Sequence, residues 1–159
     1  MFQVYDKLHL DRIPQRYTVE AGEALDDEWA LTGDDGRYDL WILGPNGFLR
    51  TFKGQASSAT AGLSLEVRQD KADASLTVTM RNSSRAPAVV RIEDAYRKDE
   101  GAVQVALQPG SQRAQTWRLQ GNGLWYDLTF TAEGGFERRL AGRLETGKDS
   151  VSDPLMGMG

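Results

Sequence analysis

The 159-residue sequence contains no cysteine, which excludes disulfide bonds and thiolate metal sites and leaves the redox compartment open. Its single histidine, His9, cannot form a multi-histidine zinc site, and it leaves no spare base for a Ser-His-Asp array. We therefore predict neither a metal nor a cofactor. No apolar run approaches the roughly 20 residues of a membrane-spanning helix. Residues 1–6 lack the basic start and apolar stretch of a secretory signal, so the signal of an exported parent protein would lie upstream.

The charge is low and evenly spread. Nineteen basic and 23 acidic residues give a formal net charge of −4, without runs of one sign. Such a distribution provides no electrostatic surface for nucleic acid, so no nucleic-acid partner is expected. The hydrophobic content of 40% is that of a globular chain.

Residues 1–54 and 89–142 are two copies of one motif, aligned without a gap at an offset of 88 residues. The shared positions include Trp29 and Trp117, Tyr38-Asp39-Leu40 and Tyr126-Asp127-Leu128, Gly47 and Gly135, Arg50 and Arg138, and Gly54 and Gly142. Met1 aligns with Val89, yet strand-like sequence begins upstream of Val89, at about Leu63. The first copy therefore lacks about 26 residues (89 − 63) that the second has, and we expect the chain to be a piece of a longer protein.

Period-two alternation of apolar and polar residues dominates the chain and predicts an all-β fold. Leu63, Leu65 and Val67 alternate with polar residues, as do Leu76, Val78 and Met80. Turn sequences separate seven predicted strands at 63–67, 76–80, 88–93, 103–107, 113–119, 125–131 and 136–145. This spacing favours an antiparallel β-sandwich of the immunoglobulin or fibronectin type, with little helix.

The repeat and the local composition divide the chain into four parts. Residues 1–54 are a truncated first β-sandwich repeat, and residues 63–147 are a complete second one. Residues 55–62, which are small and polar, have linker composition. Residues 148–159 form a C-terminal tail. We expect the apolar face of the first repeat to be covered by the second repeat or by a partner chain, which makes self-association an open alternative.

The repeated aromatic residues are candidates for the core. Each tyrosine begins a predicted strand, as in the tyrosine corner of immunoglobulin-like sandwiches, and each tryptophan lies nine residues earlier, on the preceding strand. We predict a structural core of Trp29, Tyr38, Phe48, Trp117, Tyr126 and Phe136. By alternation, Trp41 and Trp125 face outward, where packing between modules is favoured over contact with lipid.

The acidic residues offer little chemistry. Asp39 and Asp127 repeat, but they lie on separate modules, so a structural role with Arg50 and Arg138 as their ion-pair partners is our hypothesis. The clusters Asp26-Asp27-Glu28 and Asp34-Asp35 could bind calcium. Neither cluster recurs in the second copy, which favours solvated charge.

The two copies resemble the repeated C-terminal module of bacterial phosphocholine-preferring, non-haemolytic-type phospholipases C. The resemblance rests on residues 37–50, from Arg37-Tyr38-Asp39-Leu40 to Gly47-Phe48-Leu49-Arg50, and on Trp125-Tyr126-Asp127-Leu128 with Gly135-Phe136-Glu137-Arg138. Residues 145–154 are similar to the end of the same enzymes, and the resemblance covers essentially the whole chain.

The resemblance implies a parent enzyme with a large N-terminal catalytic domain that cleaves phosphatidylcholine or sphingomyelin. In this family the C-terminal modules are β-rich accessories, and nothing in this chain matches the catalytic motifs. The implied role is a non-catalytic region, secreted or periplasmic, that packs on the catalytic domain and stabilises it. The alternative is a module that binds a phospholipid surface. An independent enzyme is disfavoured because no nucleophile and base are paired.

Overall fold

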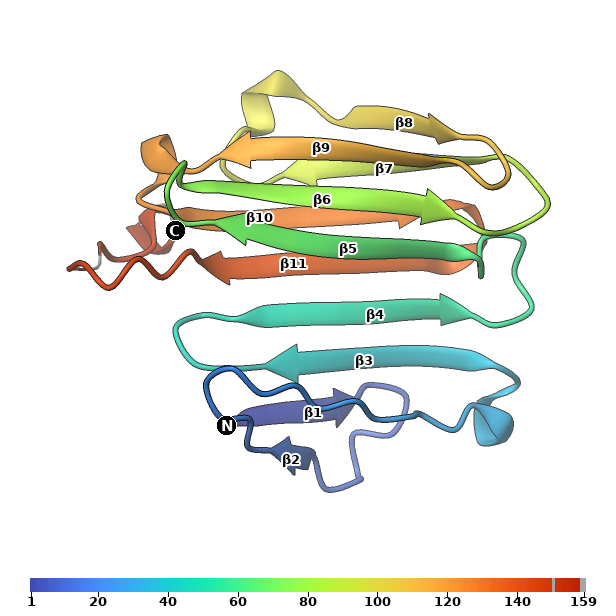
Figure 1. The fold of residues 1–159 in the computed structure, drawn as a ribbon. Coiled ribbons are helices and arrows are strands. Elements are labelled where there is room, and N and C mark those ends of the chain that lie inside the picture. The colour runs from blue at the N-terminus through green and yellow to red at the C-terminus, as the bar shows by residue number, and fades with distance from the viewer. Residues whose placement is uncertain (150, 158–159) are drawn as a thin grey trace.

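The structure is a computed structural model that describes residues 1–149 and 151–157. Within these residues the regular structure consists of β-strands and short 3-10 helices (Figure 1). The strands are β1 (Phe2–Asp6), β2 (Gln15–Tyr17), β3 (Arg37–Leu43), β4 (Leu49–Gln55), β5 (Leu63–Asp70), β6 (Ser75–Asn82), β7 (Ala88–Asp94), β8 (Val103–Leu107), β9 (Gln112–Arg118), β10 (Trp125–Ala132) and β11 (Phe136–Arg143). The 3-10 helices are η1 (Thr32–Asp34), η2 (Lys98–Glu100), η3 (Gln120–Asn122), η4 (Glu133–Gly135) and η5 (Pro154–Gly157).

The strands form two antiparallel sheets. One has eight strands in the order β2-β1-β3-β4-β11-β10-β7-β8, and the other has three in the order β5-β6-β9. The three-stranded sheet lies over β11, β10, β7 and β8 and leaves β4, β3, β1 and β2 without a second sheet (Figure 1).

The hydrophobic core lies between the two sheets in the second half of the chain. Alternation places Leu76, Val78 and Met80 of β6 inward, each no more than 1% exposed. From the opposite sheet, Leu128 and Phe130 of β10 meet them at 1% or less exposure. At about 25 cal/mol per Å² of apolar surface removed from water, this core is the main source of stability.

The two halves of the large sheet have the same strand order and register. Val4 pairs with Ile42 and Tyr38 with Gly54, as Ile92 pairs with Phe130 and Tyr126 with Gly142, 88 residues later. The halves join where β4 and β11 pair antiparallel, with the equivalent residues Thr51 and Arg139 opposite each other. An approximate twofold axis therefore passes through the sheet at this seam.

The seven strands expected over residues 63–145 are confirmed, with boundaries within about three residues. The expected strand around Trp29 is wrong, because residues 24–30 have no regular secondary structure and no neighbouring strand to pair with. The second half covers the edge of the first half by strand pairing, but it does not cover its face.

The expected linker and tail adopt ordered structure where they are described. Residues 56–62 form turns, and the buried Thr60 donates a hydrogen bond to the carbonyl of Glu133 at 2.7 Å. In the tail, Asp153 accepts a hydrogen bond from the hydroxyl of Tyr96. Positions 150 and 158–159 of the tail lie outside the described residues, and the division into domains stays a prediction.

Candidate functional site

Two arginines tie the halves together across the seam. Arg50 of β4 donates to the hydroxyl of Tyr126 at 2.8 Å and to the carbonyl of Ala141 at 3.0 Å. Arg138 of β11 donates to the hydroxyl of Tyr38 at 2.7 Å and to the carbonyl of Lys53 at 2.8 Å. Each arginine thus binds the tyrosine of the other half. This reciprocity explains why arginine and tyrosine repeat together at the 88-residue offset.

Aromatic rings and a glycine complete each half of the seam. The Arg50 guanidinium lies 4.3 Å from the centroid of the Phe48 ring, and Arg138 lies 4.3 Å from that of Phe136, which are cation–π distances. The Tyr38 ring lies over Gly54, where a Cβ atom would sit 2.6 Å from the tyrosine hydroxyl oxygen. Only glycine permits this approach.

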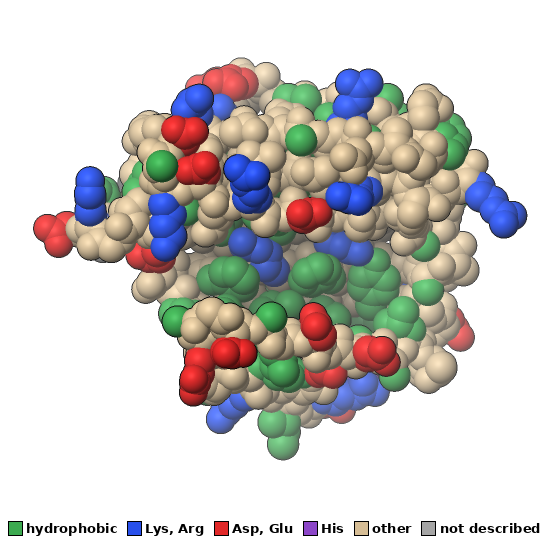
Figure 2. All heavy atoms as spheres, viewed as in Figure 1, with side chains coloured by type: hydrophobic (Ala, Val, Ile, Leu, Met, Phe, Trp, Pro, Cys, Tyr) green, Lys and Arg blue, Asp and Glu red, His purple; other side chains and the backbone are tan. Residues whose placement is uncertain are grey.

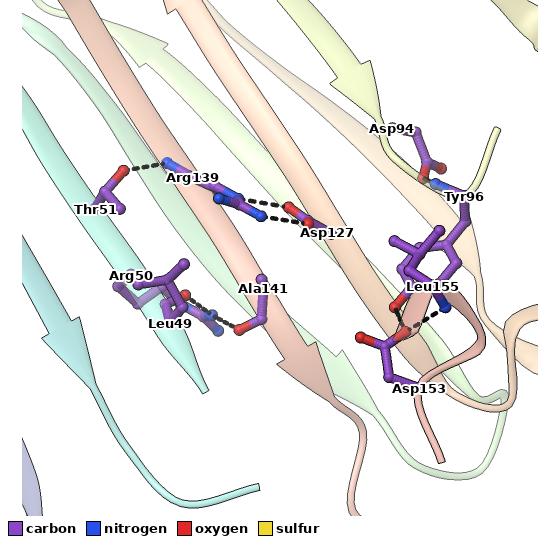
Figure 3. A network of polar contacts seen from close by, with 10 residues as sticks. All are labelled: Leu49, Arg50, Thr51, Asp94, Tyr96, Asp127, Arg139, Ala141, Asp153 and Leu155. Carbon is purple, nitrogen blue, oxygen red and sulfur yellow. Dashed lines mark hydrogen bonds and ion pairs between the residues drawn. The ribbon is translucent and has the colours of Figure 1, made fainter. Parts of the chain in front are cut away.

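The predicted ion pairs of the two arginines with Asp39 and Asp127 are wrong. Asp127 instead forms a bidentate pair with Arg139, at 2.8 and 2.7 Å (Figure 3). Alternation explains the difference, because Arg50 and Arg138 lie on the core face of the sheet whereas the aspartates lie on the outer face. Asp39 forms no ion pair among the described residues.

We expect Arg50→Ala to destabilise the chain by about 2 kcal/mol, because Tyr126 and the Ala141 carbonyl lose a charged donor in a partly buried seam. Combining it with Tyr126→Phe should give a coupling energy of about 1 kcal/mol in urea denaturation. The matched cycle of Arg138→Ala with Tyr38→Phe should give a similar value. Strictly additive effects in both cycles would contradict the reciprocal seam.

The core face of the first half is an open apolar surface. Phe2, Leu40 and Ile42 are partly exposed, whereas their counterparts in the second half are Val90, Leu128 and Phe130, at 0–1% exposure. A hollow of about 450 Å³ lies on this face, lined by residues that include Phe2, Val4, Tyr17, Trp29, Leu40 and Ile42. Figure 2 shows hydrophobic and basic side chains in a hollow that crosses the molecule below the three-stranded sheet.

The two repeated tryptophans have different surroundings. Trp117 of β9 is 5% exposed and packs edge-on against Phe130, with 6.1 Å between ring centroids. Trp29 is only partly buried and lines the hollow. The other residues of the predicted core differ in the same way: Tyr126 and Phe136 are buried, and Tyr38 and Phe48 are partly exposed. The hollow thus coincides with the half that lacks a second sheet.

The two outward tryptophans lie on separate surfaces. Trp125 donates to the carbonyl of Val151 at 2.8 Å, and its ring lies against Gly47 of the first half. Trp41 is 39% exposed, with the Lys7 ammonium 4.2 Å from its ring centroid. Trp125 therefore contacts both the tail and the first half, while Trp41 remains at the surface.

The outer face of the second half carries a polar cleft of about 560 Å³, lined by Asp94, Asp127 and Arg139 among others. Burial is the main cause that raises the pKa of Asp94, while the hydrogen bonds that Arg139 donates to Asp127 raise the pKa of Arg139. Asp39 and Asp127 lie three strand spacings apart in the sheet, about 14 Å across the strands at 4.8 Å per spacing, and they are also offset by four residues (131 − 127) along the strands. The structure therefore does not bring them together as an acid–base pair.

One cluster was predicted only in part, because the sequence indicated Asp34 as a possible cation ligand but not Asp6 or His9. Ligand atoms of Asp6, His9 and Asp34 lie within 4.8 Å of one another. His9 Nε2 lies 2.7 Å from Asp34, and Asp6 accepts hydrogen bonds from the Leu8 amide and from Arg12. The counterpart Asp94 accepts a bond from the Tyr96 amide in the same way, so this aspartate shapes the turn after its strand. Of the two calcium candidates, Asp26-Asp27-Glu28 lies outside this cluster, whereas Asp34 of the second candidate belongs to it.

Comparison with known proteins identifies the family of the chain. A model of the family "Bacterial phospholipase C, C-terminal domain" matches residues 1–55 and 60–143. The chain belongs to this family. It is 37% identical over 168 residues to a non-hemolytic phospholipase C of Pseudomonas aeruginosa and 39% identical over 161 residues to one of Burkholderia pseudomallei. It is also 38% identical over 151 residues to a hemolytic phospholipase C of Pseudomonas aeruginosa.

The matches to the phospholipases C cover 100%, 98% and 91% of this chain, but only 24%, 23% and 20% of the relatives. The chain thus spans about a quarter of the length of the phospholipases that it matches. No helix among the described residues is long and apolar enough to cross a membrane.

Proposed function

We propose that this chain is the non-catalytic C-terminal region of a secreted bacterial phospholipase C, where it packs on the catalytic part and stabilises it. The parent would hydrolyse phosphodiesters such as phosphatidylcholine or sphingomyelin. The observation that carries the proposal is the open apolar face of the first half, within a chain about a quarter the length of its relatives. Exposed apolar surfaces that face a hollow can mark contacts with another part of a protein.

We further infer that the second half is a β-sandwich of the immunoglobulin type and that the first half is a truncated copy of it. The equal strand order, the equal register and the family match in two ranges support this inference. The seam then joins two modules into one sheet. A continuous sheet fixes the two modules relative to each other, as expected of a region that stabilises a neighbouring domain.

The purified chain should have no phosphodiesterase activity on phosphatidylcholine or on a chromogenic phosphocholine ester, with or without divalent metals. The reason is chemical: Asp39 and Asp127 are separated, and Asp127 is engaged by Arg139. Turnover that scales with the amount of chain and is lost in Asp39→Asn or Asp127→Asn would contradict the proposal.

Vesicle sedimentation tests the support role against lipid targeting. The chain should stay in the supernatant with phosphatidylcholine vesicles, because one face of the exposed Trp41 ring is covered by the Lys7 ammonium and the chain has a net charge of −4. Trp41→Ala provides the control. Pelleting of the chain that Trp41→Ala abolishes would favour a lipid-binding module instead.

A further inference from the structure

We propose that the open face of the first half is a docking surface for a β-hairpin formed by residues that precede Met1 in the longer phospholipase chain. The hairpin would pair with residues 24–30 and close a second sandwich over β4, β3 and β1. The inference rests on the proposed function only in assuming that longer chain.

The second half defines the shape of the missing piece. There β5 and β6 form a hairpin, and β6 pairs with β9 along its length, with Leu76 opposite Trp117. The counterpart of β9 is residues 24–30, which include Trp29. Because Met1 corresponds to Val89, counterparts of Leu63 and Asn82 would lie 26 and 7 residues ahead of Met1 (89 − 63 and 89 − 82).

Residues 24–30 present an unpaired strand edge. No backbone-to-backbone hydrogen bond involves them in the described part of the chain. The flanking turn is nevertheless preserved: the Gly36 amide bonds to the Leu31 carbonyl, as the Leu124 amide does to Leu119. The segment therefore leads into the same turn as β9 does. Apart from the Glu28 amide, which donates to Asp27 Oδ1 at 2.8 Å, its backbone groups have no hydrogen-bond partner among the described residues and are available to a second strand.

The core face of the first half also lacks one hydrogen bond that its counterpart has. Tyr126 accepts a second hydrogen bond from Gln69 of β5 at 3.2 Å, in addition to that from Arg50. Tyr38 accepts only from Arg138 within the described residues. A strand in the place of β5 would cover the partly exposed rings of Tyr38 and Phe52, and a donor at the position equivalent to Gln69 would reach the Tyr38 hydroxyl.

The chain enters at the right place for such a hairpin. β1 begins at Phe2, which itself lines the hollow and lies 5.2 Å from the Phe48 ring. In the second half, only the turn of residues 83–87 separates β6 from β7. A turn of similar length ahead of β1 would bring the preceding strand directly onto the open face. The same chain is thus favoured over a second copy, because the linkage keeps its local concentration high.

Hydrogen exchange on two chains tests the proposal. The 159-residue chain is compared with the same chain extended by the 26 residues that precede Met1 in its parent protein. We expect the extension to slow exchange of amides 24–30 on the order of 100-fold, and to reduce binding of the dye ANS to the hollow. Exchange of residues 112–118 in β9 should be unchanged, which also verifies that the extended chain is folded.

The matched control is an extension of equal length in which the inward apolar residues are replaced by serine, and it should give no protection. Supplying the 26 residues as a synthetic peptide should slow exchange of the same amides. Unchanged exchange with both extension and peptide would overturn the proposal, as would equal protection by the serine control. Concentration-dependent protection in the unextended chain would instead identify a second copy as the occupant. Since no phospholipase activity is measured, these results stand apart from those that test the support role.

Discussion

Replacing Trp117 by alanine is expected to lower the free energy of unfolding by about 3–5 kcal/mol, the usual cost of deleting a large buried aromatic side chain. The indole is 5% exposed, lies edge-on to Phe130, and sits opposite Leu76 in the strand register. Its removal would leave a cavity in the only sandwich core that the described residues close. Urea denaturation followed by far-UV circular dichroism measures the change.

Trp29→Ala is the matched control at the equivalent position of the first half. Because Trp29 is only partly buried and borders an open hollow, its loss should cost about 1 kcal/mol or less. Equal losses for the two variants would show that the first half has a closed core of its own. A change below about 1 kcal/mol for Trp117→Ala would contradict the burial of that residue.

The first half should be the weaker half in the isolated chain. We expect backbone amides within 63–145 to exchange on the order of 100-fold more slowly than those within 1–54. The physical reason is that β6 and β10 are covered by an opposing sheet, whereas β1 and β3 have one open face. Exchange measured by mass spectrometry at several protein concentrations tests this difference.

Dissociation of any oligomer should loosen residues 1–54 preferentially, because the open face is where a partner would bind. The β4–β11 seam should be the best protected part of the first half, since β4 pairs with a strand of the half that has a second sheet. Protection that is equal in both halves and independent of concentration would contradict the truncated-module interpretation.

The strand pattern of the second half could be read from the sequence because its alternation is regular. Leu76, Val78 and Met80 face one way in β6, and turns rich in Asn, Ser and Pro separate the strands. The 88-residue offset also indicated the equal register of the two halves. These patterns can be recognised in the sequence without knowledge of which strands pair in the tertiary fold.

The contacts across the seam could not be predicted in this way. Alternation gives the face of Arg50 but not its neighbour, and the pairing of β4 with β11 brings together residues about 90 positions apart. The predicted strand around Trp29 was wrong for a related reason. The sequence there fits a strand, but a strand needs a neighbour to pair with, and none of the described residues supplies one. The sequence did contain one signal for these contacts. An arginine and a tyrosine both repeat at the 88-residue offset, which suggests that the two side chains contact each other.

We propose that this region supports the catalytic part of a phospholipase C without taking part in its chemistry. The decisive measurement is thermal inactivation of the parent enzyme with and without residues 1–159. We predict that the shortened enzyme keeps kcat on a soluble phosphocholine ester within about threefold. Its half-life at an elevated temperature should fall by about tenfold or more. An unchanged half-life, or a kcat lost in a shortened enzyme that remains folded, would contradict the claim.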